Sequence, residues 1–195
     1  QQKAYNSVLN EFLTKDVCLL HGVTSSGKTE IYIHLIQKAL EEGKQVLYLL
    51  PEIALTTQIT SRLQRVFGNQ LGVYHSKCTD AERVEIWKKQ LSDHPYDVIL
   101  GVRSSVFLPF KKLGLIIVDE EHETTYKQQD PAPRYHARNT ALVLGAILKA
   151  KTVLGTATPS IETWYNAKQG KYGLVELKER YKEIQLPEII PVVNS

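Results

Sequence analysis

The residues with the clearest chemistry form a glycine-rich stretch at 22–29, which reads Gly-Val-Thr-Ser-Ser-Gly-Lys-Thr. It fits the P-loop pattern G-x-x-x-x-G-K-[ST], and it follows an apolar run and opens a helical pattern, as that motif requires. Backbone N–H groups of such a loop curl around phosphate oxygens, and the helix N-terminus adds positive potential. We expect Lys28 to reach the β- and γ-phosphates and Thr29 to ligate Mg²⁺. The alternative is a glycine-rich turn without a ligand. The expected nucleotide-binding residues here are Gly22, Thr24, Ser26, Gly27, Lys28 and Thr29.

A carboxylate cluster follows a second apolar run, at 115–118, and reads Asp-Glu-Glu-His over 119–122. Asp119 at the strand end suits the holding of Mg²⁺, directly or through water. Glu120 is placed to polarise an attacking water. With Lys28, these two carboxylates are the predicted catalytic residues. The alternative is a solvated acidic turn, which a neighbouring P-loop makes the weaker reading because nucleotide hydrolysis needs such a strand.

A third motif, Gly-Thr-Ala-Thr-Pro-Ser at 155–160, also follows an apolar run. The hydroxyl groups of Thr156 and Thr158 are candidates for sensing the γ-phosphate or for linking it to a second ligand. The alternative is a capped turn in which Ser160 or Thr158 caps the next helix, with proline near its first turn. The two roles are compatible.

Two further segments carry side chains suited to nucleic acid. The first follows the apolar run at 97–101 and offers a cation and hydroxyls, which are common phosphate contacts. The second, at 126–138, is irregular and interleaves cations with aromatic rings, as single-strand binding surfaces do. The alternative for the second segment is a proline-rich loop with incidental tyrosines. The side chains expected to contact DNA or to couple it to the nucleotide are Arg103, Ser104, Tyr126, Lys127, Arg134, Tyr135 and Arg138.

The elements that must position these residues alternate between strands and helices. Alternation of this kind predicts an α/β fold with a mostly parallel sheet and helices on both faces, as in P-loop NTPases. All four motifs then follow strands, at the edge where open α/β sheets bind ligands. In the helix at 80–91 we expect Val84, Trp87 and Leu91 to form the apolar face. Strands are expected at 17–21, 45–50, 71–74, 97–101, 115–119 and 152–155, and helices at 29–42, 54–67, 80–91, 137–149 and 160–167.

Composition sets the broad class. The 195 residues are 43% hydrophobic and 23% charged, which is ordinary for a soluble globular fold and excludes full-length disorder. No apolar run reaches the roughly 18 residues of a membrane span, and no signal peptide is visible. The net charge of +3 is too small to indicate nucleic acid by itself. Cys18 and Cys78 show no metal-binding spacing, so we expect reduced thiols in a cytoplasmic protein.

The organisation of the chain is expected to be simple. Residues 1–177 are predicted to form one lobe, and 178–195, which contain two prolines and no clear period, an extended linker. The chain contains no Met and begins with Gln1, so we expect a piece of a longer protein.

In this order, the motifs resemble superfamily 2 helicases, and most closely the bacterial primosomal replication-restart helicases of the PriA family. The Asp-Glu-Glu-His box followed by Tyr-Lys-Gln-Gln is the most specific part of the resemblance. It covers residues 1 to about 177. The segments that carry it are 22–24, 27–30, 51–56, 74–76, 101–107, 119–122, 126–129, 134–138 and 157–160.

The resemblance implies the first RecA-like lobe of a 3′-to-5′ DNA helicase that couples ATP hydrolysis to unwinding during replication restart. It implies that Gln1 reads adenine, that Arg103 and the segment 51–56 touch the DNA backbone, and that the loop 126–138 couples DNA to hydrolysis. Implied partners are forked or single-stranded DNA, primosome proteins and single-strand binding protein, with no membrane.

Several parts of that family are missing from this sequence. The second lobe with its arginine finger, an N-terminal DNA-binding region and a zinc-binding cysteine cluster are not present, so the zinc of the full-length family has no expected site here. We therefore expect little hydrolysis from this chain alone. Two other readings stay open: a P-loop phosphotransferase, and an ATP-gated DNA-binding module without turnover.

Overall fold

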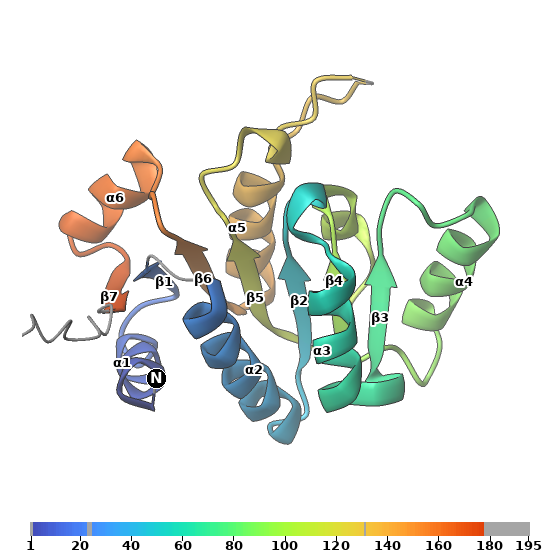
Figure 1. Ribbon diagram of the computed structural model, residues 1–195, viewed down its shortest axis with the longest axis horizontal. Coiled ribbons are helices and arrows are strands. Elements are labelled where there is room, and N and C mark those ends of the chain that lie inside the picture. Colours follow the sequence, from blue (N-terminus) through green and yellow to red (C-terminus); the bar gives the residue numbers. More distant parts are fainter. Residues whose placement is uncertain (1, 23–24, 131, 178–195) are drawn as a thin grey trace, which may run out of the picture.

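A computed structural model describes residues 2–22, 25–130 and 132–177 of the chain (Figure 1). The predicted linker at 178–195 lies outside the described residues, as do Gln1 and Thr24.

The core of the fold is a seven-stranded sheet in the order β3-β4-β2-β5-β6-β1-β7. Every neighbouring pair is parallel, so the carboxyl ends of all strands meet at one edge (Figure 1). Strands covered on both faces are apolar throughout, and all five residues of β2 are buried. The strands are β1 Val17–Gly22, β2 Gln45–Leu49, β3 Leu71–Tyr74, β4 Val98–Gly101, β5 Leu113–Asp119, β6 Lys151–Thr156 and β7 Gly173–Leu177.

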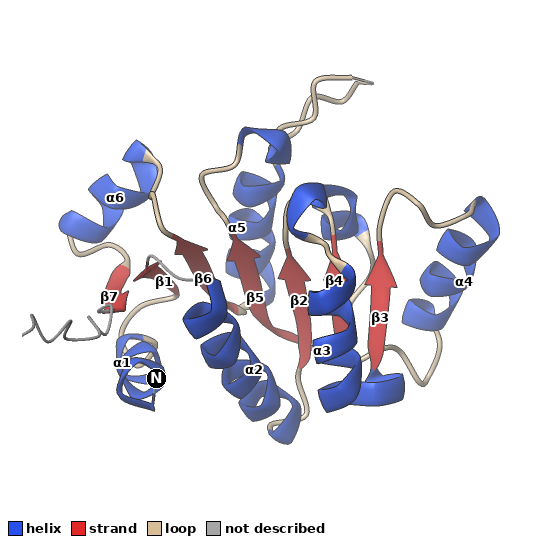
Figure 2. Ribbon diagram, in the orientation of Figure 1, coloured by secondary structure: helices blue, strands red, loops and turns tan. Residues whose placement is uncertain are grey.

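Helices cover both faces of this sheet, as Figure 2 shows in blue against red strands. One apolar cluster joins the sheet to α1, α2 and α3, and a second joins it to α4, α5 and α6. The predicted α/β architecture is therefore confirmed. The helices are α1 Gln2–Glu11, α2 Ser25–Glu41, α3 Thr57–Phe67, α4 Asp80–Leu91, α5 Ala137–Leu148 and α6 Ile161–Lys168, with short 3₁₀ turns at Glu52–Ala54, Gly68–Gln70, Arg103–Phe107 and Thr124–Tyr126.

Two features differ from the sequence-based expectation. The helix α1 and the edge strand β7 were not predicted, and they pack against each other beside β1. The expected apolar face of α4 was wrong, because Val84, Trp87 and Leu91 are exposed. Ile86 and Gln90 are buried instead. The Gln90 side chain keeps this face of α4 against the sheet. Its amide N–H donates to the Pro109 carbonyl at 3.1 Å, and its amide oxygen accepts from the backbone N–H of Tyr96 at 2.9 Å.

Candidate nucleotide and nucleic-acid site

The P-loop lies where β1 ends and α2 begins. Gly22 closes β1, opposite Leu177 of β7, and a Cβ there would stand 2.8 Å from the Leu177 side chain, so only glycine fits. Lys28 and Thr29 lie in the first turns of α2. The Lys28 side chain is 1% exposed, and its ammonium lies 3.3 Å from Glu120 Oε1. The side chain of Ser26, like the whole of Thr24, is outside the described part of the chain.

The two predicted catalytic carboxylates stand at the end of β5. Asp119 is its last residue, and Glu120 follows with a φ of 50°, in the left-handed region that costs a non-glycine residue about 1 kcal/mol. Strain of this kind is typical of functional sites. Burial raises the pKa of Asp119, while the Lys28 ammonium and a hydrogen bond from Tyr32 oppose that rise.

The donor set fits a nucleotide with Mg²⁺. Magnesium prefers oxygen ligands and is usually held by one or two carboxylates together with substrate phosphates. The hydroxyl of Thr29 and the carboxylates of Asp119 and Glu120 line one cleft of about 530 Å³. Arg62 and Arg65 of α3 line the same cleft, and Arg62 pairs with Glu30 of α2. Thr29 and Asp119 would hold the ion, and Lys28 the phosphates.

The end of β6 is linked to Glu120 through His122. The Thr156 hydroxyl lies 2.6 Å from His122 Nδ1 and accepts from the backbone N–H of Thr158 at 3.0 Å. The same His122 nitrogen lies 3.8 Å from Glu120 Oε2. Thr156 is buried and Thr158 is exposed. Ser160 is the N-cap of α6, because its side chain accepts from the backbone N–H of residue 163 at 3.3 Å. Of the two residues proposed as caps, it is therefore Ser160, not Thr158, that caps this helix.

Glu121 is the centre of a buried hydrogen-bond network that joins β5 to α5 and α6. Its carboxylate is fully buried and accepts from the backbone N–H of Ser160 at 2.7 Å and from the Thr163 hydroxyl at 2.9 Å. The Arg138 guanidinium donates to it at 3.1 Å and also pairs with Glu162. Arg138 was expected to contact DNA or to couple it to the nucleotide, and in this structure its side chain is only 8% exposed and pairs with two carboxylates.

A groove of about 450 Å³ runs beside the nucleotide cleft and brings together three of the predicted DNA residues, Arg103, Ser104 and Tyr126. The Arg103 guanidinium donates to the carbonyl of Thr125 at 3.0 Å. Tyr126 was expected to contact DNA or to couple it to the nucleotide, and the residue is only 1% exposed in this structure. Its hydroxyl instead donates to the backbone carbonyl of Asp119.

The remaining candidates lie on a hairpin that projects beyond the carboxyl edge of the sheet, between β5 and α5 (Figure 1). Lys127 and His136 form an antiparallel bridge at its base. Lys127 and Arg134 are exposed. Tyr135 is half-buried, and its ring packs edge-on against Phe107 at 4.7 Å between centroids. The structure thus places two exposed cations on the hairpin and one half-buried aromatic ring at its base.

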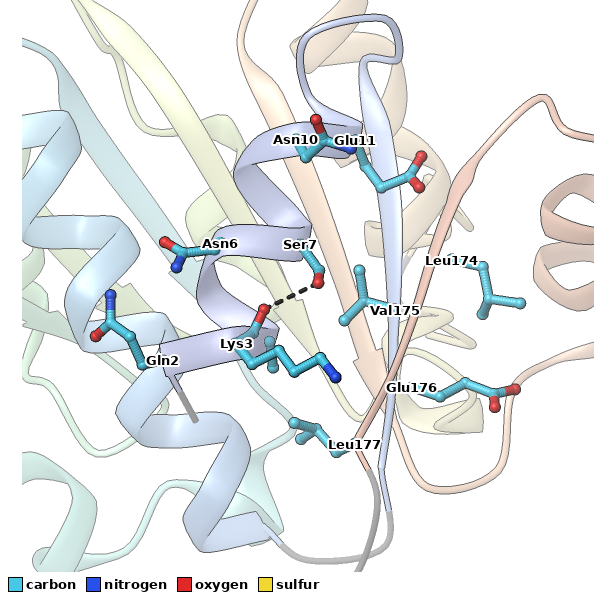
Figure 3. Close-up of a pocket in the computed structure, with 11 residues that line it drawn as sticks. Gln2, Lys3, Asn6, Ser7, Asn10, Glu11, Leu174, Val175, Glu176 and Leu177 are labelled. Carbon is cyan, nitrogen blue, oxygen red and sulfur yellow. Dashed lines mark hydrogen bonds between the residues drawn. The ribbon is translucent and has the colours of Figure 1, made fainter.

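A separate hollow of about 960 Å³ lies between α1 and β7 (Figure 3). Lys3 and Leu177 lie at one end of it, and Asn10 and Glu11 at the other. Its polar groups form few contacts with each other, apart from the Ser7 hydroxyl, which donates to the Lys3 carbonyl at 2.9 Å. The Leu177 end adjoins Gly22, where the P-loop begins.

Cys18 and Cys78 are both buried and free. Across residues 2–22, 25–130 and 132–177, no group of three or more His, Cys, Asp or Glu side chains is arranged to hold a metal ion by itself. Within the same ranges, none of the helices combines the length and the apolar character that crossing a membrane requires.

Sequence reasoning missed two buried tyrosines beneath the cleft. Tyr32 of α2 donates to Asp119 Oδ1 at 2.8 Å, and the Tyr48 hydroxyl shares a hydrogen bond with Thr29. Burial raises the pKa of both phenols well above the usual range. One signal was available: Tyr32 follows Lys28 by one helical turn and therefore shares its face of α2.

Comparison with known proteins matches residues 1–166 to the family model described as DEAD/DEAH box helicase. Among curated proteins, the replication restart protein PriA of Rickettsia felis is 51% identical over 189 residues, and that of Bacillus subtilis 42% identical over 192. Each match covers 97% of this chain, which spans only 28% and 24% of those two relatives. These matches confirm the resemblance drawn from the motifs.

Solved structures share the fold. The helicase MrfA bound to DNA and AMPPNP superposes with a TM-score of 0.62 at 17% identity, covering 91% of this chain and 26% of that one. RecG bound to a three-way DNA junction gives 0.61 at 23% identity, covering 94% of this chain and 24% of that one. At these identities the likeness establishes the architecture alone.

Proposed function

Because the chain belongs to the DEAD/DEAH box helicase family, we propose that it is the ATP-binding lobe of an ATP-dependent DNA helicase acting in replication restart, with 3′-to-5′ polarity. One observation carries this proposal most directly. The Tyr126 hydroxyl reaches from the groove lined by Arg103 to the backbone of Asp119, a carboxylate of the nucleotide cleft. The candidate DNA groove and the candidate hydrolysis site therefore share one hydrogen bond.

On the nucleotide side, three side chains divide the work. Lys28 is held by Glu120 in this structure and is expected to turn to the phosphates, which would release Glu120 Oε1 to orient water. Thr29 and Asp119 would hold Mg²⁺. Bound Mg-ATP supplies the phosphoryl group that water attacks. His122 links Glu120 to Thr156, so the end of β6 is positioned to sense whether the carboxylate has moved.

The base of the nucleotide is expected to extend from Gly22 toward the hollow between α1 and β7. Support comes from the register, which puts Leu177 of that hollow opposite Gly22, and from Gln2, which lines the hollow directly after the proposed adenine reader Gln1. Gln1 itself lies outside the described residues.

On the DNA side, the groove residues Arg103 and Ser104 and the exposed hairpin cations Lys127 and Arg134 are proposed to contact phosphates. Tyr126 would act as the coupling residue, because any shift of the groove wall moves Asp119. Forked or single-stranded DNA is the proposed substrate, and primosome proteins and single-strand binding protein are the proposed partners. A cytoplasmic location fits this role and the free thiols of Cys18 and Cys78.

Calorimetric titration with Mg-ADP tests the nucleotide site. Lys28→Ala removes a charge-assisted bond of about 1.5–3 kcal/mol, so its affinity should fall by roughly 10- to 100-fold. Lys38→Ala is the matched control, since that exposed lysine lies at the far end of the same helix and pairs with Glu42. Equal affinity of the wild type and Lys28→Ala would refute the assignment.

Steady-state ATPase assays against DNA concentration, made on a protein that carries this lobe together with a second RecA-like lobe, test the rest. Glu120→Gln should keep nucleotide binding and lose turnover by about 10²- to 10⁴-fold. Tyr126→Phe should keep DNA affinity and blunt stimulation by single-stranded DNA, whereas Lys127→Ala with Arg134→Ala should weaken DNA binding and its salt dependence. DNA-insensitive phosphate transfer to a small molecule would favour the phosphotransferase, and binding without turnover the ATP-gated module.

A further inference from the structure

Two tyrosines are buried directly beneath the nucleotide cleft. Tyr32 belongs to α2 and Tyr48 to β2, and the two side chains are 0% and 1% exposed. Their rings meet edge to face, with centroids 5.4 Å apart and planes at 80°. This geometry is the favoured one for aromatic pairs, so the two rings hold each other in place.

Each hydroxyl reaches a different candidate ligand of the metal ion. Tyr32 donates to Asp119 Oδ1 at 2.8 Å, and the Tyr48 hydroxyl shares a hydrogen bond with the Thr29 side chain. Tyr48, Thr29 and Asp119 all line the same cleft. The two ligands come from different elements, α2 and β5, yet the edge-to-face rings connect them into one unit.

The fold reserves space for one of these hydroxyls. Gly155 of β6 stands in register with Asp119, and a Cβ on it would lie 1.6 Å from the Tyr32 oxygen. A buried hydroxyl costs free energy unless it is hydrogen-bonded, and phenylalanine would fill the same apolar space without that cost. The hydroxyl therefore has a use that packing alone does not explain.

We propose that Tyr32 and Tyr48 are positioning residues that orient Asp119 and Thr29 for the Mg²⁺ that accompanies the nucleotide. The inference rests on the proposed function, since it concerns the same cleft. Neither tyrosine needs to touch the ion: groups that hydrogen-bond to metal ligands fix their orientation, and their loss typically costs about 10- to 100-fold in metal affinity.

The test measures ADP affinity by calorimetry, with and without Mg²⁺, for the 195-residue chain. The readout is the dissociation constant for ADP without Mg²⁺ divided by that with Mg²⁺. This ratio isolates the contribution of the metal. Tyr32→Phe and Tyr48→Phe keep the rings, so each should lower that ratio by about 10-fold while the metal-free affinity stays within about 2-fold of the wild type. Mn²⁺ in place of Mg²⁺, followed by its paramagnetic resonance spectrum, should show weaker binding in the same variants.

Tyr172→Phe is the matched control, because its phenol also has a side-chain hydrogen bond, to Asn166, but it lies just before β7, which β6 and β1 separate from β5 and Asp119. Its ratio should equal that of the wild type. The inference is overturned if the Tyr32 and Tyr48 variants keep the wild-type ratio. It is also overturned if their metal-free affinity falls as much as their affinity with Mg²⁺, or if they lose the folded circular dichroism spectrum. In each case the pair belongs to the core alone. If the wild type binds no nucleotide, the proposed function itself fails.

Discussion

Replacing Glu121 by glutamine should destabilise the protein far more than the same change at Glu162, although both carboxylates contact one guanidinium. Glu121 is fully buried beside the 8%-exposed side chain of Arg138, whereas the Glu162 side chain is 77% exposed. Breaking a buried pair leaves an uncompensated charge and costs about 3–5 kcal/mol, while an exposed pair contributes about 0–1 kcal/mol.

The lower end of that range applies to Glu121→Gln. Glu162 still neutralises part of the Arg138 charge, and the glutamine oxygen can still accept from the backbone N–H of Ser160. A loss of about 3 kcal/mol corresponds to a fall in melting temperature of about 6–12 °C for a chain of this size, against less than about 4 °C for Glu162→Gln.

Thermal and urea unfolding of both variants measure the difference. Arg138→Met in the Glu121→Gln background should cost less than the sum of the two single changes, because the charge left unpaired is removed with its partner. Equal stability losses for Glu121→Gln and Glu162→Gln would show that burial does not control this network, and the argument from the buried charge would have to be abandoned.

Three further predictions follow from single side chains. Burial raises the pKa of Cys18 to about 12, so iodoacetamide at pH 8 should leave it unmodified in the folded chain and modify it in urea, as mass spectrometry would show. Burial, reinforced by Arg138, lowers the pKa of His136, so the unfolded state binds more protons than the folded state. The free energy of unfolding should therefore fall as pH drops through about 6.5. His136→Gln should flatten that slope in denaturation measured across pH. Gly155→Ala should cost about 1–3 kcal/mol or more in urea unfolding because its methyl group would overlap the Tyr32 hydroxyl, and a smaller loss would mean that Tyr32 can move.

The order of elements was largely predictable, because buried parallel strands are apolar runs and helices end at glycine. Failures came where polarity misled. Gln90 is buried in α4 because its amide finds the Pro109 carbonyl, so the helix turns Trp87 outward. The edge strand β7 was missed because it carries Glu176 and lacks the uniform burial of the central strands.

Within the candidate site, side-chain type predicted membership better than role. Tyr126 and Arg138 were both expected, from their type, to contact DNA or to couple it to the nucleotide. Both are buried: the Tyr126 hydroxyl donates to the Asp119 backbone and the Arg138 guanidinium to Glu121. Burial depends on what neighbouring elements cover, which a local stretch of sequence does not state.

The P-loop motif and the carboxylate box can be recognised in the sequence alone, because each is a short segment whose chemistry depends on residues a few positions apart. Distances between segments follow from the fold instead. It placed Lys28 3.3 Å from Glu120, although 92 positions separate them, and set Tyr32 against Asp119 across 87. The parallel sheet does this, since it brings the carboxyl ends of strands from across the chain to one edge, and side-chain packing then selects which groups meet there.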